Sequence, residues 1–351
     1  MDAPAVVDDL DPHAEPKFES GDGSITFEPS PTFVITPTIQ AIIERALTYL
    51  QAGYAVHFSG PAGAGKTTLA FHVATLLGRP AVLLHGDHEF GSSDLVGRES
   101  GYRKSRVVDN YIASVMKFQE EGRALWVDNR ITTACRLGHT ILYDEFNRSR
   151  AEANNPFLSI LSEGVLNVPR LHGRGEGYVS VHPDFRAIFT SNPAEYAGVH
   201  RTQEALLDRV ITLRLGHYDR DTEIAITAGK SGLDTGEAET IVDLVRLCRR
   251  EGKDPHVPTI RACIAIARVL ATRDRKVDVR DPVFVSACHD ILGSTGPMAS
   301  WDVDRSYEFI SALLRHFDPR AAGAKVRAQA PASPAEDDAG GRQLQQEVQS
   351  W

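Results

Sequence analysis

The stretch Gly60-Pro61-Ala62-Gly63-Ala64-Gly65-Lys66-Thr67 decides how the rest of this sequence is interpreted. It follows an apolar, strand-like run at 54–59 and precedes a helical pattern that runs from Thr67 to Leu77 and ends at Gly78. Glycines at this spacing let successive backbone N–H groups curl around phosphate oxygens. The lysine supplies a cation for the β- and γ-phosphates, and the threonine supplies a hydroxyl for Mg²⁺. A strand, this loop and a helix therefore predict a nucleoside triphosphate site.

The predicted nucleotide contacts come from the loop and the first residues of the helix. They are Gly60, Pro61, Ala62, Gly63, Ala64, Gly65, Lys66, Thr67 and Thr68. The alternative is an ordinary glycine-rich turn. Such a turn does not need glycine at the positions where a phosphate loop brings its backbone close to a ligand. We therefore expect Lys66 to reach the β- and γ-phosphates and Thr67 to bind Mg²⁺.

Composition limits the class of protein. A chain of 351 residues has room for about two domains. The net charge of −9 argues against general binding to nucleic acid. No apolar run approaches the roughly 18 residues that a membrane span needs, and the acidic start lacks the features of a signal peptide. Four cysteines without a C-x-x-C pair favour reduced thiols: Cys135, Cys248, Cys263 and Cys288. The expectation is a cytoplasmic protein that does not contact membranes.

Apolar runs alternate with helical stretches through the first two thirds of the chain. They lie at 55–58, 81–84, 140–143, 187–190 and 210–213. This alternation predicts an α/β fold with a parallel sheet between helices, as one domain over residues 31–218. Helical spacing alone continues at 219–230, 237–250, 259–272, 281–292 and 303–316. We expect a helical domain over 219–317, with disordered tails at 1–30 and 318–351, where large apolar residues are few.

A second chemical motif is Thr140-Ile141-Leu142-Tyr143-Asp144-Glu145, an apolar strand that ends in two carboxylates. Asp144 would lie beside Mg²⁺, and Glu145 would polarise the water that attacks the γ-phosphate. Alone, such an ending is also that of an ordinary surface strand. Coupled to the phosphate loop, it indicates hydrolysis of the bound nucleotide.

Two later strand boundaries carry further polar residues. Asn192, which follows the run at 187–190, could hydrogen-bond the attacking water or the γ-phosphate; the alternative is an Asn-Pro turn. Arg209 closes Ala205-Leu206-Leu207-Asp208-Arg209 just before the last strand. It either pairs internally with Asp208 or Glu204, or projects into the nucleotide site of a neighbouring subunit.

The order of these motifs resembles that of the AAA+ ATPases, and Asp144-Glu145-Phe146-Asn147-Arg148 resembles their MoxR-type branch. More narrowly, the stretch at 143–155 resembles the gas vesicle protein N family. It reads Tyr-Asp-Glu-Phe-Asn-Arg-Ser-Arg-Ala-Glu-Ala-Asn-Asn. Further similar stretches are Val108-Asp109-Asn110, the residues 181–186 and the residues 190–200. The resemblance covers about residues 31–292 and leaves out both tails.

The resemblance implies an AAA+ fold, in which a five-stranded parallel sheet with flanking helices precedes an all-helical lid. It implies ATP with Mg²⁺, ATP hydrolysis, and a homo-oligomeric ring, usually a hexamer, with ATP between subunits. Arg209 would then be an arginine finger, a contact worth roughly 10³–10⁵ in turnover. Arg261, at the start of a predicted lid helix, would be the second sensor of the γ-phosphate, and Arg268 is a competing candidate.

For partners, the resemblance implies gas vesicle shell or accessory proteins, and a place in the cytoplasm with the vesicles. One alternative is a MoxR-type chaperone that activates a metalloenzyme or chelatase. Another is a nucleotide-regulated scaffold with negligible turnover, although a scaffold needs neither Glu145 nor Arg209.

Two elaborations are expected to carry the partner-specific surface. The segment Glu89–Lys117 is too long for a simple connection and corresponds to the helix-2 insertion of the branch. The segment Val165–His182 is predicted to form two short strands, as in the hairpin before the first sensor. Its tip contains Arg170 and Arg174, which belong either to a solvated turn or to a pore loop that grips an acidic partner segment.

Overall fold

The computed structural model describes residues 32–89, 91, 96–109, 117–128, 130–168, 177–193, 204–251, 257–294 and 301–317. The two predicted tails lie outside these residues, as do the tip of the second hairpin and residues 194–203. Among the described residues, no helix combines the length and the apolar character that crossing a bilayer requires.

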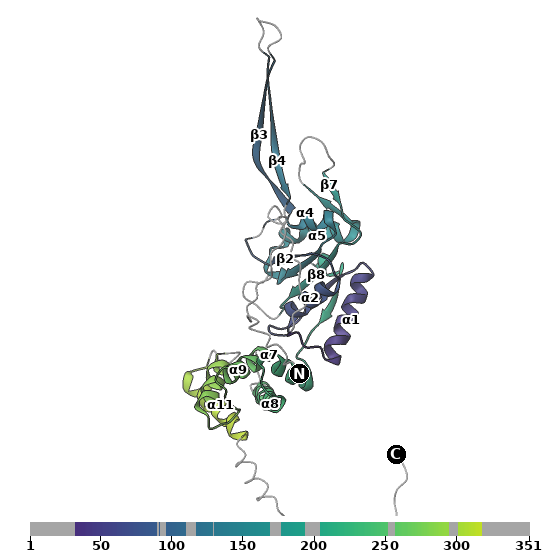
Figure 1. Cartoon of the computed structure of the whole chain (residues 1–351). Coiled ribbons are helices and arrows are strands. Elements are labelled where there is room, and N and C mark those ends of the chain that lie inside the picture. The colour runs from purple at the N-terminus through teal and green to yellow at the C-terminus, as the bar shows by residue number, and fades with distance from the viewer. Residues whose placement is uncertain are drawn as a thin grey trace, which may run out of the picture.

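The described residues form a five-stranded sheet in which every neighbouring pair of strands is parallel (Figure 1). The strands are β1 (Ala55–Ser59), β2 (Ala81–His85), β5 (Thr140–Asp144), β8 (Arg186–Ser191) and β9 (Val210–Arg214). Their order across the sheet is β2-β5-β8-β1-β9. The parallel sheet predicted from the apolar runs and the five strands implied by the resemblance are both confirmed, and each run lies within one strand. All five carboxyl ends consequently meet at one edge.

Both faces of the sheet are buried, because alternate side chains of each strand enter two different hydrophobic clusters. Val56 and Phe58 pack with α1 (Pro37–Gln51) and α2 (Lys66–Leu76) on one face. Ile141 and Tyr143 pack with α4 (Arg130–Leu137) and α5 (Ala151–Glu163) on the other. A strand buried on both faces needs apolar residues at consecutive positions, which is why these strands are continuous apolar runs.

Beyond β9 the described residues are helical. The helices are α7 (Arg220–Ser231), α8 (Thr235–Glu251), α9 (Ile260–Thr272), α10 (Pro282–Gly293) and α11 (Val303–His316), all within two residues of the predicted bounds. Four of them are capped at the amino end by a side chain that accepts a backbone N–H of the first turn; the capping residues are Asp219, Thr259, Asp281 and Asp302. Their apolar faces share one cluster around Val245, Ile266 and Phe284. The predicted all-helical region is confirmed.

A long antiparallel hairpin departs from the sequence-based expectation. β3 (Gly97–Asp109) pairs with β4 (Lys117–Asp128) and extends away from the sheet as an arm (Figure 1). Thirteen residues of strand correspond to an arm of about 40 Å. The insertion therefore extends to Asp128, past the predicted limit at Lys117. The second hairpin, β6 (Val165–Asn167) with β7 (Tyr178–Ser180), has the two predicted strands, whereas Arg170 and Arg174 lie outside the described residues.

His57 is a buried polar residue in the middle of β1, which lies between β8 and β9. Its Nδ1 lies 3.0 Å from Thr212 Oγ1 on β9, and its Nε2 lies 2.8 Å from Ser191 Oγ on β8. Its ring meets Phe146 edge to face. Burial lowers the pKa of His57 to about 4, since the charged imidazolium would lose its hydration. The folded chain therefore holds this side chain neutral.

We predict that His57 makes the fold sensitive to acid. Between pH 6.5 and 4 the unfolded chain binds a proton at this position and the folded chain does not, so the free energy of unfolding falls as the pH falls. Relative to His57→Gln, which does not titrate, the parent should lose about 2 kcal/mol between pH 7 and pH 5. Urea unfolding at both pH values measures this difference. Parallel losses in parent and variant would contradict the prediction.

Candidate nucleotide site

The parallel strands bring most of the predicted site residues to one edge. The phosphate loop follows β1, Asp144 ends β5, and Asn192 follows β8, so all three lie at the carboxyl edge of the sheet. The loop is joined to its neighbours through the backbone. Gly60 N donates to Ser191 O at 3.3 Å, and Leu215 N donates to Ser59 O at 2.7 Å. This edge is where α/β sheets generally bind ligands.

The loop needs glycine for its conformation and for its surroundings. Gly63 and Gly65 have φ values of +76° and +74°, in the left-handed region that side chains disfavour. A Cβ on Gly60 would lie 2.3 Å from the carbonyl oxygen of Leu215, and one on Gly63 would lie 2.2 Å from Thr259 Oγ1. The loop is thus enclosed between the end of β9 and the start of α9. Such a backbone cradle fits a polyphosphate.

The predicted phosphate-binding lysine is folded over this loop. Lys66 is buried, and its Nζ donates to the carbonyl oxygens of Gly60 at 2.9 Å and Pro61 at 2.7 Å. These bonds hold the ammonium group across the loop mouth. The cation is therefore already positioned where phosphate oxygens would meet the loop amides.

The predicted metal ligands are in direct contact. Thr67 Oγ1 donates to Asp144 Oδ1 at 2.8 Å, and Thr190 Oγ1 on β8 donates to the same oxygen at 2.5 Å. Hydroxyl and carboxylate oxygens are the ligands that Mg²⁺ prefers, together with water and phosphate. Thr67 and Asp144 therefore fit a magnesium ion bound with a nucleotide. Thr190 was not among the predicted site residues. It lies beside Asp144 because Phe189 pairs with Tyr143 in the β5–β8 register, which no local sequence pattern indicates.

Glu145 lies at a sharp turn after β5. Its φ of +51° places it in the left-handed region, and its N–H donates to Thr190 Oγ1 at 3.0 Å. Its carboxylate forms an ion pair with Arg148, with 2.6 Å between Oε2 and Nε. The turn continues into η1 (Phe146–Arg148). Strain of this kind, held by its surroundings, is common where a side chain must take one exact place at a site.

Two buried contacts hold that turn. Tyr143 donates its hydroxyl to Ser149 Oγ at 2.7 Å, and Ser149 Oγ also accepts the N–H of Asp87 at 3.0 Å. Burial raises the pKa of Tyr143 to about 12, so the hydroxyl remains a donor throughout the physiological range. Asn192 is buried at the same edge, and its backbone carbonyl accepts a hydrogen bond from Asn147 Nδ2 at 3.3 Å. Asn192 thus lies beside the turn that carries Glu145.

Arg209 lies at the opposite edge of the sheet. It immediately precedes β9, whose five residues separate it from the loop edge by about 16 Å. Its guanidinium donates to Ser162 Oγ and, at 2.6 Å, to the Ala205 carbonyl. Among the described residues it forms no ion pair with Asp208 or Glu204, the internal partners considered from the sequence. Arg209 also lines a cavity of about 430 Å³ at this edge.

The two sensor candidates occupy opposite parts of α9. Arg261 is exposed in the first turn, two residues after Thr259, which touches the phosphate loop at Gly63. Arg268 lies two turns further on, and its Nε donates to the Lys230 carbonyl of α7 at 3.0 Å. Seven residues of helix separate them by about 10 Å. Of the two, Arg261 is next to the loop.

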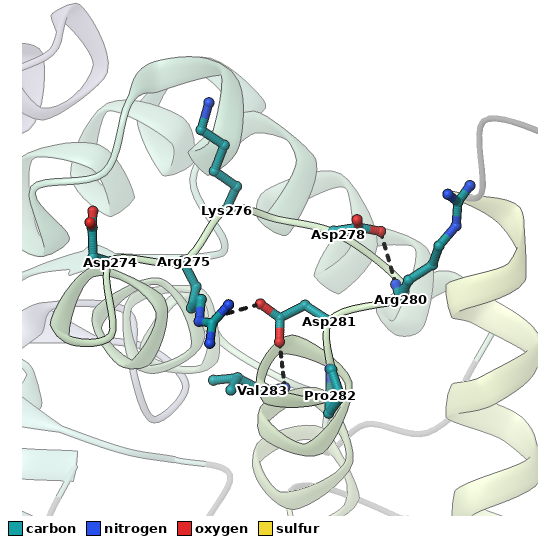
Figure 2. A pocket seen from close by; sticks show the side chains of 8 residues that line it. All are labelled: Asp274, Arg275, Lys276, Asp278, Arg280, Asp281, Pro282 and Val283. Atoms are coloured by element: carbon teal, nitrogen blue, oxygen red, sulfur yellow. Dashed lines mark hydrogen bonds and ion pairs between the residues drawn. The ribbon is translucent and has the colours of Figure 1, made fainter.

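A cavity of about 540 Å³ in the helical region is not the nucleotide site. Figure 2 shows it lined by the connection between α9 and α10, where Arg275 pairs with Asp281 and Asp281 caps α10. Its residues run from Asp274 to Val283, beyond the carboxyl end of α9. The phosphate loop meets the amino end of that helix, about 20 Å away along its axis.

Comparisons with known proteins agree with this geometry. Residues 55–210 match the family described as AAA domain (dynein-related subfamily). The protein named gas vesicle ATPase GvpN of Ancylobacter aquaticus is 48% identical over 271 residues, covering 77% of this chain and 76% of that protein. GvpN of Haloferax mediterranei is 44% identical, covering 75% and 74%. A more distant relative, protein CbbQ of Hydrogenophilus thermoluteolus, is 25% identical and covers 57% and 68%.

The likeness to the two GvpN proteins is not confined to the sheet. It extends over three quarters of each chain, whereas the AAA domain match covers less than half of this one. Identity at this level over this length shows common family membership. The AAA domain match and the relatives named as ATPases show that the chain is a P-loop ATP hydrolase. The chain belongs to the gas vesicle ATPase GvpN family, within the MoxR-type AAA+ ATPases.

Proposed function

We propose that this chain hydrolyses ATP to assist the assembly of gas vesicles, in the cytoplasm, by remodelling shell or accessory proteins. The observation that carries the proposal is the 48% identity to a protein named gas vesicle ATPase over three quarters of the chain. The metalloenzyme-chaperone alternative has weaker support, because the MoxR-type relatives outside the GvpN proteins are distant. Protein CbbQ is 25% identical, and protein NorQ of Paracoccus denitrificans is 24% identical.

We assign roles at the carboxyl edge from the contacts described there. The loop amides and Lys66 bind the phosphates, Thr67 and Asp144 hold Mg²⁺, and Thr68 lies beside them in the first turn of α2. Bound Mg²⁺ would neutralise charge on the β- and γ-phosphates. Glu145 orients the attacking water, and Asn192 supports it from the end of β8.

The first prediction from these assigned roles separates nucleotide binding from turnover. Lys66→Ala should abolish ATP binding, because the phosphates lose the cation at the loop mouth. Glu145→Gln should bind ATP with parental affinity yet lose at least 10²-fold in turnover, because an amide cannot accept the proton of water. Fluorescent-nucleotide titration and phosphate release measure the two quantities. Glu163→Gln, an exposed carboxylate at the end of α5, serves as the control. Parental turnover in Glu145→Gln would refute the assigned role.

We further propose that ATP binds between subunits of a homo-oligomeric ring, with six subunits as in most AAA+ rings. Arg209 lies about 16 Å along β9 from the phosphate loop of its own chain, too far for direct contact. Its side chain is half-buried beside a cavity, and its guanidinium donates to two uncharged groups, Ser162 Oγ and the Ala205 carbonyl. These features suit an arginine that acts on the γ-phosphate of a neighbouring chain. Arg261 would contact the γ-phosphate of its own chain from the start of α9.

The second prediction follows from this arrangement. ATP turnover per chain should rise steeply with protein concentration as rings form, because each site needs Arg209 from a second chain. Arg209→Ala should bind ATP normally and lose about 10³-fold in turnover at every concentration. Arg45→Ala, an exposed arginine on α1, is the control. Turnover independent of concentration in a monomeric preparation would exclude action in trans.

The third prediction tests the cellular role. In cells whose own copy is deleted, Lys66→Ala or Glu145→Gln should yield few or small vesicles while shell protein is still made. Electron microscopy and shell-protein blots measure both quantities. Normal, full-length vesicles with the ATPase-dead variants would reject the proposed function and favour the metalloenzyme-chaperone alternative.

A further prediction concerns a client contact. The double variant Arg170→Ser, Arg174→Ser should spare ATP turnover and impair vesicle growth if the hairpin tip contacts a client.

A further inference from the structure

The helical region contains a buried carboxylate that is paired with two arginines. Glu223 on α7 has a side chain only 1% exposed, and both of its carboxylate oxygens are paired with arginines of α8. Oε2 lies 2.9 Å from Arg246 NH1, and Oε1 lies 2.6 Å from Arg249 NH1. Burying such groups removes their hydration, so a buried ion pair by itself is weak evidence of a role in stability. The cluster needs another explanation.

Each arginine also holds a backbone carbonyl. Arg246 NH1 donates to Tyr218 O at 3.4 Å, and Arg249 Nε donates to Pro258 O at 2.5 Å. The two carbonyls come from separate connections, one between β9 and α7 and the other between α8 and α9. Glu223 therefore joins these two connections through the arginines, because it fixes the orientation of both guanidinium groups.

Both connections touch the phosphate loop at its left-handed glycines. The hydroxyl of Tyr218 lies 3.4 Å from where a Cβ on Gly65 would be. Thr259, next to Pro258, has its Oγ1 only 2.2 Å from the corresponding position on Gly63. The same Thr259 oxygen caps α9 by accepting the backbone N–H of Arg261 at 3.3 Å. A shift of either connection would change the space around the loop and the place of Arg261.

We propose that Glu223 is a positioning residue for the nucleotide site, which sets the placement of Tyr218 and Thr259 against the phosphate loop through Arg246 and Arg249. The inference rests on the phosphate loop being the ATP site, as proposed above. Its expected signature is a change in nucleotide affinity in a chain that remains folded, since the loop residues themselves are unaltered.

The same helix pair offers a matched control. Arg220 on α7 pairs with Glu239 and Asp243 on α8, so this network also links the two helices by ion pairs. It differs in that its side chains are 37–49% exposed, and the Arg220 guanidinium donates to Glu239 and Asp243 and, among the described bonds, to no carbonyl of the connections that reach the loop. Glu239→Gln thus removes a carboxylate from the same interface without touching the nucleotide site.

The test compares Glu223→Gln with Glu239→Gln by fluorescent ATP binding, at a temperature where circular dichroism shows both variants folded. We expect Glu223→Gln to raise the Kd for ATP about tenfold, a typical size for coupling between sites, and Glu239→Gln to leave it within twofold. If Glu223 only stabilises the fold, its variant will have a lower melting temperature and the parental Kd. That result would overturn the proposal.

A second variant covers the case in which Glu223→Gln does not fold. Arg249→Lys keeps a cation for Glu223 and removes the donor to Pro258 O, so it should also raise the Kd for ATP. A parental Kd in folded Arg249→Lys would overturn the proposal. The Lys66→Ala variant distinguishes a failure of the proposed ATP site from a failure of the positioning role alone. If it binds ATP normally, the loop assignment fails; if it does not and Glu223→Gln binds normally, only the positioning role fails.

Discussion

The carboxyl group and backbone of Asp144 connect the segments from which the site is built. Its Oδ1 accepts hydrogen bonds from Thr67 at the start of α2 and from Thr190 at the end of β8. Its carbonyl accepts the N–H of Gly86, which follows β2, at 2.8 Å. Parallel strands are required for this, because only then do these ends meet at one edge. Asp144 thereby holds the phosphate loop, the predicted metal ligands and the turn at Glu145 in fixed positions relative to one another.

The sheet and the helical region were predictable because their signals are local. Strands buried on both faces are continuous apolar runs, and the helices carry caps and one apolar face. The β3–β4 arm was not predicted, since its strands mix charged and apolar residues without regular alternation. The partners of Thr190 and His57 depend on strand register, which no local pattern specifies. Glu223 has the sequence context of a surface residue, and only the arrival of Arg246 and Arg249 explains its burial.

Under the proposed function, the two edges of the sheet have separate tasks. The carboxyl edge holds the phosphates and the metal, and the buried cluster around Glu223 aligns the helical connections against it. The amino edge presents Arg209 beside its cavity, far from the loop of the same chain. Neither edge is then sufficient by itself, so turnover depends on how chains are arranged. This dependence would couple ATP hydrolysis to assembly of the ring.

Mixing two inactive variants tests this claim most directly. Lys66→Ala lacks a nucleotide pocket and keeps Arg209, whereas Arg209→Ala keeps the pocket. In a randomly mixed ring, about a quarter of the interfaces would join an intact pocket to an intact arginine. We expect ATP turnover, near zero for each variant alone, to rise on mixing and to be greatest near equal amounts. A mixture that stays as inactive as its components, with mixed rings confirmed by mass spectrometry, would contradict it.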